Sequence, residues 1–113
     1  MTAYSGGRQA ALRRYEEAHP GRSVELARLR AIEQRAKARQ YVIDQKTGKA
    51  CVDCGVVYPH YVMDWDHRGD DTKVSSVAKM VSLGRPVSVI ADEIAKCDLR
   101  CANCHRIKTW GQA

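Results

Sequence analysis

Two Cys-x-x-Cys pairs restrict the possible structures of this chain more than any other feature. The first is formed by Cys51 and Cys54, and the second by Cys101 and Cys104. Thiolates at this spacing can hold one tetrahedral Zn²⁺ at about 2.3 Å. A chain of 113 residues buries only a modest core, so a structural metal would add much to its stability. We therefore predict that the four cysteines bind one structural zinc ion.

A redox-active pair or idle thiols are the alternatives to zinc. A thioredoxin-like CxxC motif would need a βαβ context, which the sequence lacks. The 46 residues from Gly55 to Arg100 are too many for a simple zinc ribbon, so we expect a sizeable insertion between the two pairs. The fifth cysteine, Cys97, is expected to be a small buried hydrophobe, or alternatively a substitute zinc ligand.

Positive charge is concentrated in the N-terminal part of the chain. The first 50 residues hold 11 basic and 5 acidic residues, whereas the remainder holds 8 of each. Such asymmetry is typical of an arm that meets a polyanion, most simply DNA, although a solvated helix is the alternative. Arg28, Arg35 and Arg39 fall on one face of a predicted helix, and we expect them to contact DNA phosphates.

The remaining patterns predict an α+β fold with a basic helical arm over residues 1–48 and a zinc-containing domain over 49–113. No apolar stretch approaches the roughly 18 residues of a membrane span, and the N-terminus has no apolar signal core. We therefore expect a cytoplasmic protein with no membrane partner. Periodicity and breaker residues predict helices over 8–19, 23–42, 73–84, 86–95 and 103–110, and strands over 61–65 and 97–101, with Ser23 as a helix N-cap and a turn over 44–50.

The stretch "MDWDH" places Asp64, Asp66 and His67 directly after an apolar run. Carboxylates in such a setting are costly unless they are paired or bound to a metal. His105 follows Cys104 immediately, so a zinc ion that joins the two Cys pairs would bring Asp66, His67 and His105 to one site. On a strand, Asp64 should share the face of Asp66, where it is a candidate to support the metal ligands from outside.

These residue types suit phosphodiester cleavage. That reaction needs a base to activate water and a cation to neutralise charge at phosphorus and at the leaving oxygen. Neutral His has a suitable pKa for the base, and an Asp with a His suits Mg²⁺, Mn²⁺, Ni²⁺ or Zn²⁺. Arg106 and Lys108 lie beside His105 in the sequence and could hold a phosphate.

The segments "CVDCG", "YPHYVMDWDH" and "EIAKCDLRCANCHRIKT" together resemble the HNH endonucleases, the ββα-metal nucleases, and most closely the small zinc-containing proteins of phages and bacteria. The resemblance covers about residues 49–109. It implies two strands and a helix clamped by zinc, and nicking or cutting of DNA. It implies that Asp66 and His105 bind a catalytic divalent ion, that His67 is the general base and that Lys108 is the lysine of the CHxxK motif. It also implies a phage origin, and then the cytoplasm of the host cell.

One position departs from the family pattern. The middle Asn of the motif usually lies nine residues before the last His, where this chain has Lys96, and Asn103 lies inside the second Cys pair. Lysine can donate to backbone carbonyls but cannot accept a hydrogen bond, so it would brace the loop that carries the base only in part. Two alternatives stay open: a catalytically weak zinc DNA-binding module, and an accessory factor whose N-terminal helices bind the large subunit of a phage terminase.

Overall fold

The computed structural model describes residues 2–69 and 72–111 of the chain, which mixes helices with one small sheet. It divides into two units, residues 1–33 and 34–113. Helix α2 crosses from the first unit into the second, so residues 34–48 of the predicted arm belong to the larger unit. None of the helices in the described ranges is long and apolar enough to span a membrane. The elements, in order, are α1 (Thr2–Ala18), α2 (Arg22–Lys46), the 3₁₀ turn η1 (His60–Val62), β1 (Met63–His67), α3 (Val77–Ser82), α4 (Val87–Ile94), β2 (Cys97–Cys101) and α5 (Ala102–Gly111).

The first unit consists of α1 and the first turns of α2. Pro20 and Gly21 separate the two helices, and Gly21 has a φ of 77° that favours glycine. The amide of Glu25 donates to the carbonyl of Gly21, so α2 is already hydrogen-bonded at its first turn. The prediction of Ser23 as the N-cap is therefore wrong, because the turn at Gly21 starts the helix at Arg22. The helix also continues to Lys46, beyond the predicted end near Val42.

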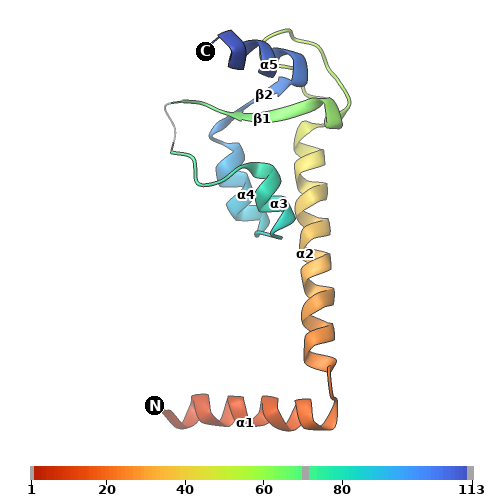
Figure 1. The fold of residues 1–113 in the computed structure, drawn as a ribbon, viewed down its shortest axis with the longest axis vertical. Coiled ribbons are helices and arrows are strands. Elements are labelled where there is room, and N and C mark those ends of the chain that lie inside the picture. Colours follow the sequence, from red (N-terminus) through yellow and green to blue (C-terminus); the bar gives the residue numbers. More distant parts are fainter. Residues whose placement is uncertain (1, 70–71, 112–113) are drawn as a thin grey trace. The chain divides into compact units, whose positions relative to one another are not determined.

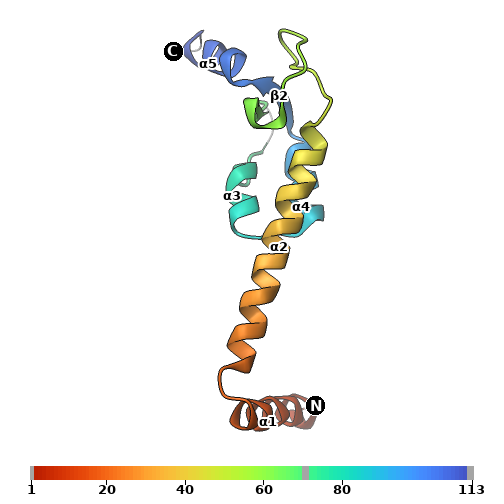
Figure 2. The ribbon, with the colours of Figure 1, turned by 90° about the vertical axis from the view of Figure 1, so that its right-hand side faces the viewer.

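The larger unit has a helical core. The second half of α2 packs against α3 and α4, which lie on one side of it in Figure 1 and flank it in Figure 2. Helix α3 is shorter than predicted because the side chain of Ser76 caps it by accepting a hydrogen bond from the amide of Lys79 at 3.1 Å. The buried residues of this core are Ala38, Val42, Val77, Met80, Ile90 and Cys97.

Strands β1 and β2 pair antiparallel, and α5 follows β2 at once (Figure 1). Trp65 lies opposite Leu99, and Asp66 opposite Asp98. The strand predicted over 61–65 begins two residues later, because the amide of Val62 donates to the carbonyl of Pro59 and forms a 3₁₀ turn first. This shift places all of "MDWDH" on β1. The insertion between the strands carries α3 and α4.

Candidate functional site

The four predicted zinc ligands lie together. One Sγ from each of Cys51, Cys54, Cys101 and Cys104 falls within 4.8 Å of all the others. Four sulfurs around one Zn²⁺ at about 2.3 Å would be about 3.8 Å apart, so the cluster fits a metal such as zinc. Within residues 2–69 and 72–111 this is the one group of three or more such ligands close enough to share an ion.

Backbone amides donate hydrogen bonds to two of the four sulfurs, which favours the thiolate form there. The amide of Cys101 donates to Sγ of Cys51, and the amide of Cys104 donates to Sγ of Cys101, both at 3.4 Å. Burial opposes ionisation of Cys51, but the surrounding backbone amides outweigh it and lower the pKa of this thiol to about 6. The hydrogen bond to Cys101, followed by burial, raises the pKa of Cys104 to about 12. Four thiolates at this spacing therefore need a cation between them.

Cys97 is not part of the zinc cluster. It is buried in the helical core, and its thiol donates to the carbonyl of Glu93 at 3.4 Å. Burial, with the negative charge of Glu93, raises the pKa of Cys97 to about 11. The prediction of a small buried hydrophobe is confirmed.

Asp64 and Asp66 share one face of β1 and meet α5 there. Nδ1 of His105 lies 3.0 Å from Oδ2 of Asp64, and Nε2 of His105 lies 3.5 Å from Oδ1 of Asp66. The two carboxylates therefore flank the imidazole on its two nitrogens. The prediction that Asp64 shares the face of Asp66 is confirmed, and the expected approach of Asp66 to His105 is present.

The second oxygen of Asp66 is held by two cations. Lys108 Nζ and Arg100 Nη1 each donate to Oδ2 at 2.8 Å. Burial works against ionisation of Asp66, but Lys108, His105 and Arg100 more than compensate, so its pKa is lower than usual. Asp66 is thus a carboxylate with Oδ2 neutralised and Oδ1 turned toward His105.

Arg100 connects this cluster to the four-cysteine cluster. It is buried, and its Nε donates to Oδ2 of Asp53 at 2.6 Å while Nη1 reaches Asp66. Asp53 lies between Cys51 and Cys54 in the sequence. The loop that carries two zinc ligands and the strand that carries Asp66 therefore share one guanidinium.

His67 lies on the opposite face of β1 from Asp66, as strand alternation requires. Its Nε2 is 2.7 Å from Oε2 of Glu93, a buried residue of α4. Burial opposes ionisation of Glu93, but Lys96, His67 and the amide of Val74 lower its pKa to about 2. The structure does not bring His67 onto the face where Asp66 and His105 meet.

Lys96, which stands where the family has Asn, braces the segment after β1. Its Nζ donates to the carbonyl of Thr72 at 2.8 Å and to Oε1 of Glu93 at 3.0 Å. Both contacts use lysine as a donor, as the sequence argument anticipated. Lys96, which lies between α4 and β2, therefore ties the chain that follows β1 to α4.

The four predicted DNA-contacting arginines lie in different surroundings. Arg28 is exposed and forms an ion pair with Glu25 at 3.0 Å. Arg35 is half-buried beside Gly84, Arg39 lines a pocket together with His105, and Arg106 is exposed on α5. Contact of these residues with DNA stays a prediction.

Sequence reasoning assigned no role to Glu93, Asp53, Lys46 or His60. Glu93 lies on an otherwise apolar helix, so its position three residues before Lys96 was the available signal. Asp53, Lys46 and His60 gave no signal, because their surroundings depend on how the segments fold together. His60 is half-buried and lines the same pocket as Arg39.

Comparison of the chain with protein-family models, with curated proteins and with solved structures found no match. The resemblance to HNH endonucleases therefore rests on the residues themselves and on the chemistry they support.

Proposed function

We propose that this chain is a metal-dependent DNA endonuclease of the HNH, or ββα-metal, type. One observation carries the proposal: Asp64 holds Nδ1 of His105, which directs Nε2 toward Oδ1 of Asp66. A carboxylate that accepts from one imidazole nitrogen makes the other nitrogen the free ligand, and this arrangement is common around metal-binding histidines. Asp64 is then the supporting residue, and Asp66 and His105 are the ligands.

The distance between the two ligand atoms fits a shared divalent ion. Atoms about 2.1 Å from one ion, and about 90–110° apart, are separated by about 3.0–3.4 Å. Nε2 of His105 and Oδ1 of Asp66 are 3.5 Å apart. A ligand pair of one carboxylate and one imidazole suits Mg²⁺, Mn²⁺, Ni²⁺ or Zn²⁺. The ion would supply charge neutralisation at the phosphorus and at the leaving oxygen.

The surrounding cations suit a phosphodiester substrate. Lys108 and Arg100 hold Asp66 ionised and in place, and Arg106 projects from the exposed side of α5. A guanidinium next to His105 can bind a non-bridging phosphate oxygen. Substrate binding and the ligand pair therefore come from the same helix, which fixes one relative to the other.

His67 is the proposed general base, and its contact with Glu93 determines which ring nitrogen can act. Nε2 is engaged by Glu93, so Nδ1 is the nitrogen that would accept a proton from water. His67 is the last residue of β1 and lies on the face opposite Asp66, so water would have to reach Nδ1 at the end of the strand. Glu93 then acts as a positioning residue that fixes the imidazole.

The test is plasmid nicking with Mg²⁺, Mn²⁺, Ni²⁺ or EDTA at matched zinc content. We expect nicking by the parent with a divalent ion, and none with EDTA during a short exposure that leaves the four-cysteine site loaded. His105→Ala should lose at least about 100-fold in rate, whereas His19→Ala, at an exposed histidine just after α1, should behave like the parent. Equal nicking by the parent and His105→Ala would overturn the assignment of the ligand.

Absence of nicking by a zinc-loaded parent that still binds DNA would instead favour a zinc DNA-binding module. His67→Ala separates the two parts of the mechanism. If it abolishes nicking without changing the binding of Mn²⁺, His67 acts on water. If it nicks like the parent, the side chain has only a structural role with Glu93.

A further inference from the structure

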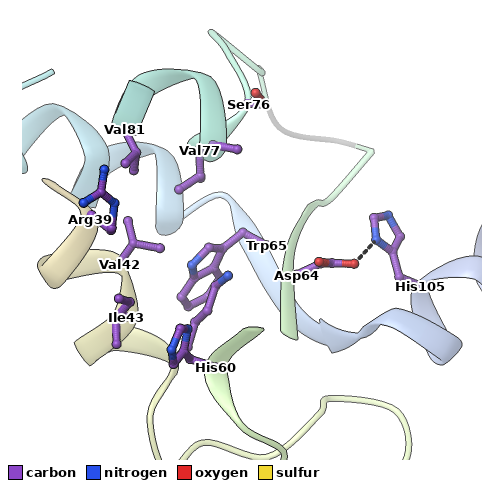
Figure 3. Close-up of a pocket in the computed structure, with 12 residues that line it drawn as sticks. Arg39, Val42, Ile43, His60, Asp64, Trp65, Ser76, Val77, Val81 and His105 are labelled. Carbon is purple, nitrogen blue, oxygen red and sulfur yellow. Dashed lines mark hydrogen bonds and ion pairs between the residues drawn. The ribbon is translucent and has the colours of Figure 1, made fainter. Parts of the chain in front are cut away.

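A pocket of about 610 Å³ opens between α2, α3 and β1 in the larger unit (Figure 3). Its walls are apolar, with Val42 and Ile43 from α2 facing Val77 and Val81 from α3. Trp65 projects from β1 toward these residues. The volume lies within the range of pockets that hold small organic ligands, and a few polar groups at the rim of such a pocket usually fix the ligand's orientation.

The polar groups at this pocket are mainly cationic. Arg39 and Lys46 come from α2, and His60 lies below Trp65 (Figure 3). Burial lowers the pKa of Lys46, although the nearby Asp64 carboxylate acts in the opposite direction. An apolar slot with two basic side chains suits a ligand that has a flat apolar part and an anionic part.

The pocket is continuous with the proposed metal ligands. Asp64 and His105 also line the pocket, and their hydrogen-bonded side chains lie on the other side of β1 from Trp65 (Figure 3). A ligand in the pocket therefore lies next to the position where the scissile phosphate would be bound.

We propose that this pocket binds the base of an unpaired nucleotide next to the scissile phosphate, with Arg39 and Lys46 on its neighbouring phosphate. The inference rests on the proposed nuclease function and names its substrate class: DNA that is single-stranded or unpaired at the cut. A base in intact duplex is stacked and paired, so it enters a pocket only after extrusion at a cost of a few kcal/mol. An unpaired base enters without that cost.

Nucleotide binding is tested apart from cleavage. In a Trp110→Phe background, Trp65 is the only tryptophan, and it lines the pocket. Titration of dAMP, dGMP, dCMP and dTMP to about 10 mM, without added divalent ions, should change its fluorescence with at least one dissociation constant near 1 mM or lower.

A blocking variant and a matched control make the result specific. Ala78 is exposed on α3 and lines the pocket, so Ala78→Phe should weaken nucleotide binding at least about fivefold. Ser82 is exposed on the same helix and is not among the pocket residues, so Ser82→Phe should bind like the parent. Saturable binding that Ala78→Phe does not weaken, or no fluorescence change up to the highest concentration, overturns the proposal.

Cleavage of matched oligonucleotides distinguishes this inference from the proposed function. The parent should cut a strand with an unpaired bubble at least about tenfold faster than the same strand in perfect duplex, a preference worth roughly 1.4 kcal/mol. Ala78→Phe should remove the preference. Equal cutting of both substrates overturns the pocket while nuclease function stands. Nucleotide binding without any cutting overturns the nuclease and leaves the pocket.

Discussion

The two faces of the β1–β2 sheet carry opposite chemistry. One face presents Asp64 and Asp66 to His105 and Lys108 of α5, in a cluster of charges that solvent can reach. The other face presents Trp65 and His67 to the helices. There His67 contacts the carboxylate of Glu93, which is almost fully buried. The first face is built from charges that are partly exposed, whereas the second combines apolar packing with a buried pair of His67 and Glu93.

The two faces bind their histidines differently: His105 pairs with an exposed carboxylate, and His67 pairs with a buried one. Asp64 is about half exposed, so its hydrogen bond to His105 orients the ring at little cost in desolvation. Glu93 is 2% exposed, so its charge depends on His67, Lys96 and the amide of Val74 for compensation. A change at Asp64 should therefore affect metal binding by His105, and a change at Glu93 should affect the stability of the larger unit.

The largest expected effect comes from disrupting the four-cysteine cluster, on which both faces of the sheet depend. Cys104→Ser should lose the metal and, with it, cooperative unfolding of the larger unit, because structural zinc commonly supplies about 10 kcal/mol or more. Cys97→Ser keeps all four ligands and should retain the metal. Metal content by mass spectrometry and thermal melts by circular dichroism provide the measurement. Full metal occupancy in Cys104→Ser would contradict the assignment.

Glu93→Gln should lower the free energy of unfolding of the larger unit by roughly 3 kcal/mol at neutral pH. The pKa of Glu93 falls from its ordinary 4.5 to about 2 on folding, so the stabilisation is complete above pH 4.5 and is lost as the pH falls toward 2. The gap between parent and variant should therefore close across that window. Urea unfolding at several pH values measures it, and a constant gap would refute the buried charge.

Asp64→Asn changes the hydrogen bond to His105 and leaves the buried pair of His67 and Glu93 intact. We expect a loss of about 10–100-fold in nicking rate or Mn²⁺ affinity, because a supporting carboxylate on a ligating histidine has this effect. Stability to urea should hardly change, since Asp64 is substantially exposed. Asp92→Asn, at an exposed carboxylate of α4, serves as a control. Similar nicking by both variants would remove Asp64 from the site.

Arg39→Gln should have the smallest effect. If Arg39 contacts a phosphate, its loss should reduce the slope of log affinity against log salt by roughly 0.9 for duplex DNA and roughly 0.7 for single strands. Lys79→Gln, an exposed position on α3 outside the pocket, should leave the slope unchanged. An equal change in both variants would mean that only net charge matters. DNA binding at several salt concentrations decides between these outcomes.

Much of the site could be predicted because it follows local rules. The Cys pairs have the spacing of metal ligands, and strand alternation placed Asp64 beside Asp66. The same alternation, applied to His67, separates it from Asp66, although the two are neighbours in the sequence. Glu93 could not be anticipated as its partner, because that contact spans 26 positions and depends on the packing of α4.

The ends of the helices also depend on tertiary contacts that the sequence pattern does not reveal. Pro20 and Gly21 marked the break between α1 and α2, but hydrogen bonding from Gly21 moved the helix start ahead of Ser23. The end of α2 at Lys46 followed from packing, since Val42 is buried against α3 and α4 and the helix continues past it. Periodicity detects that a helix exists, whereas its last turns are decided by tertiary contacts.

The double contact of Arg100 has a consequence for anyone who wishes to move this site into another protein. Asp53 belongs to the loop of the first Cys pair, and Asp66 belongs to the strand that faces α5. A graft of β1, β2 and α5 without that loop would leave a buried guanidinium with one of its carboxylates missing. The smallest piece that can be transplanted therefore includes the Cys51–Cys54 loop. This holds even if a cross-link without metal replaces the four-cysteine cluster.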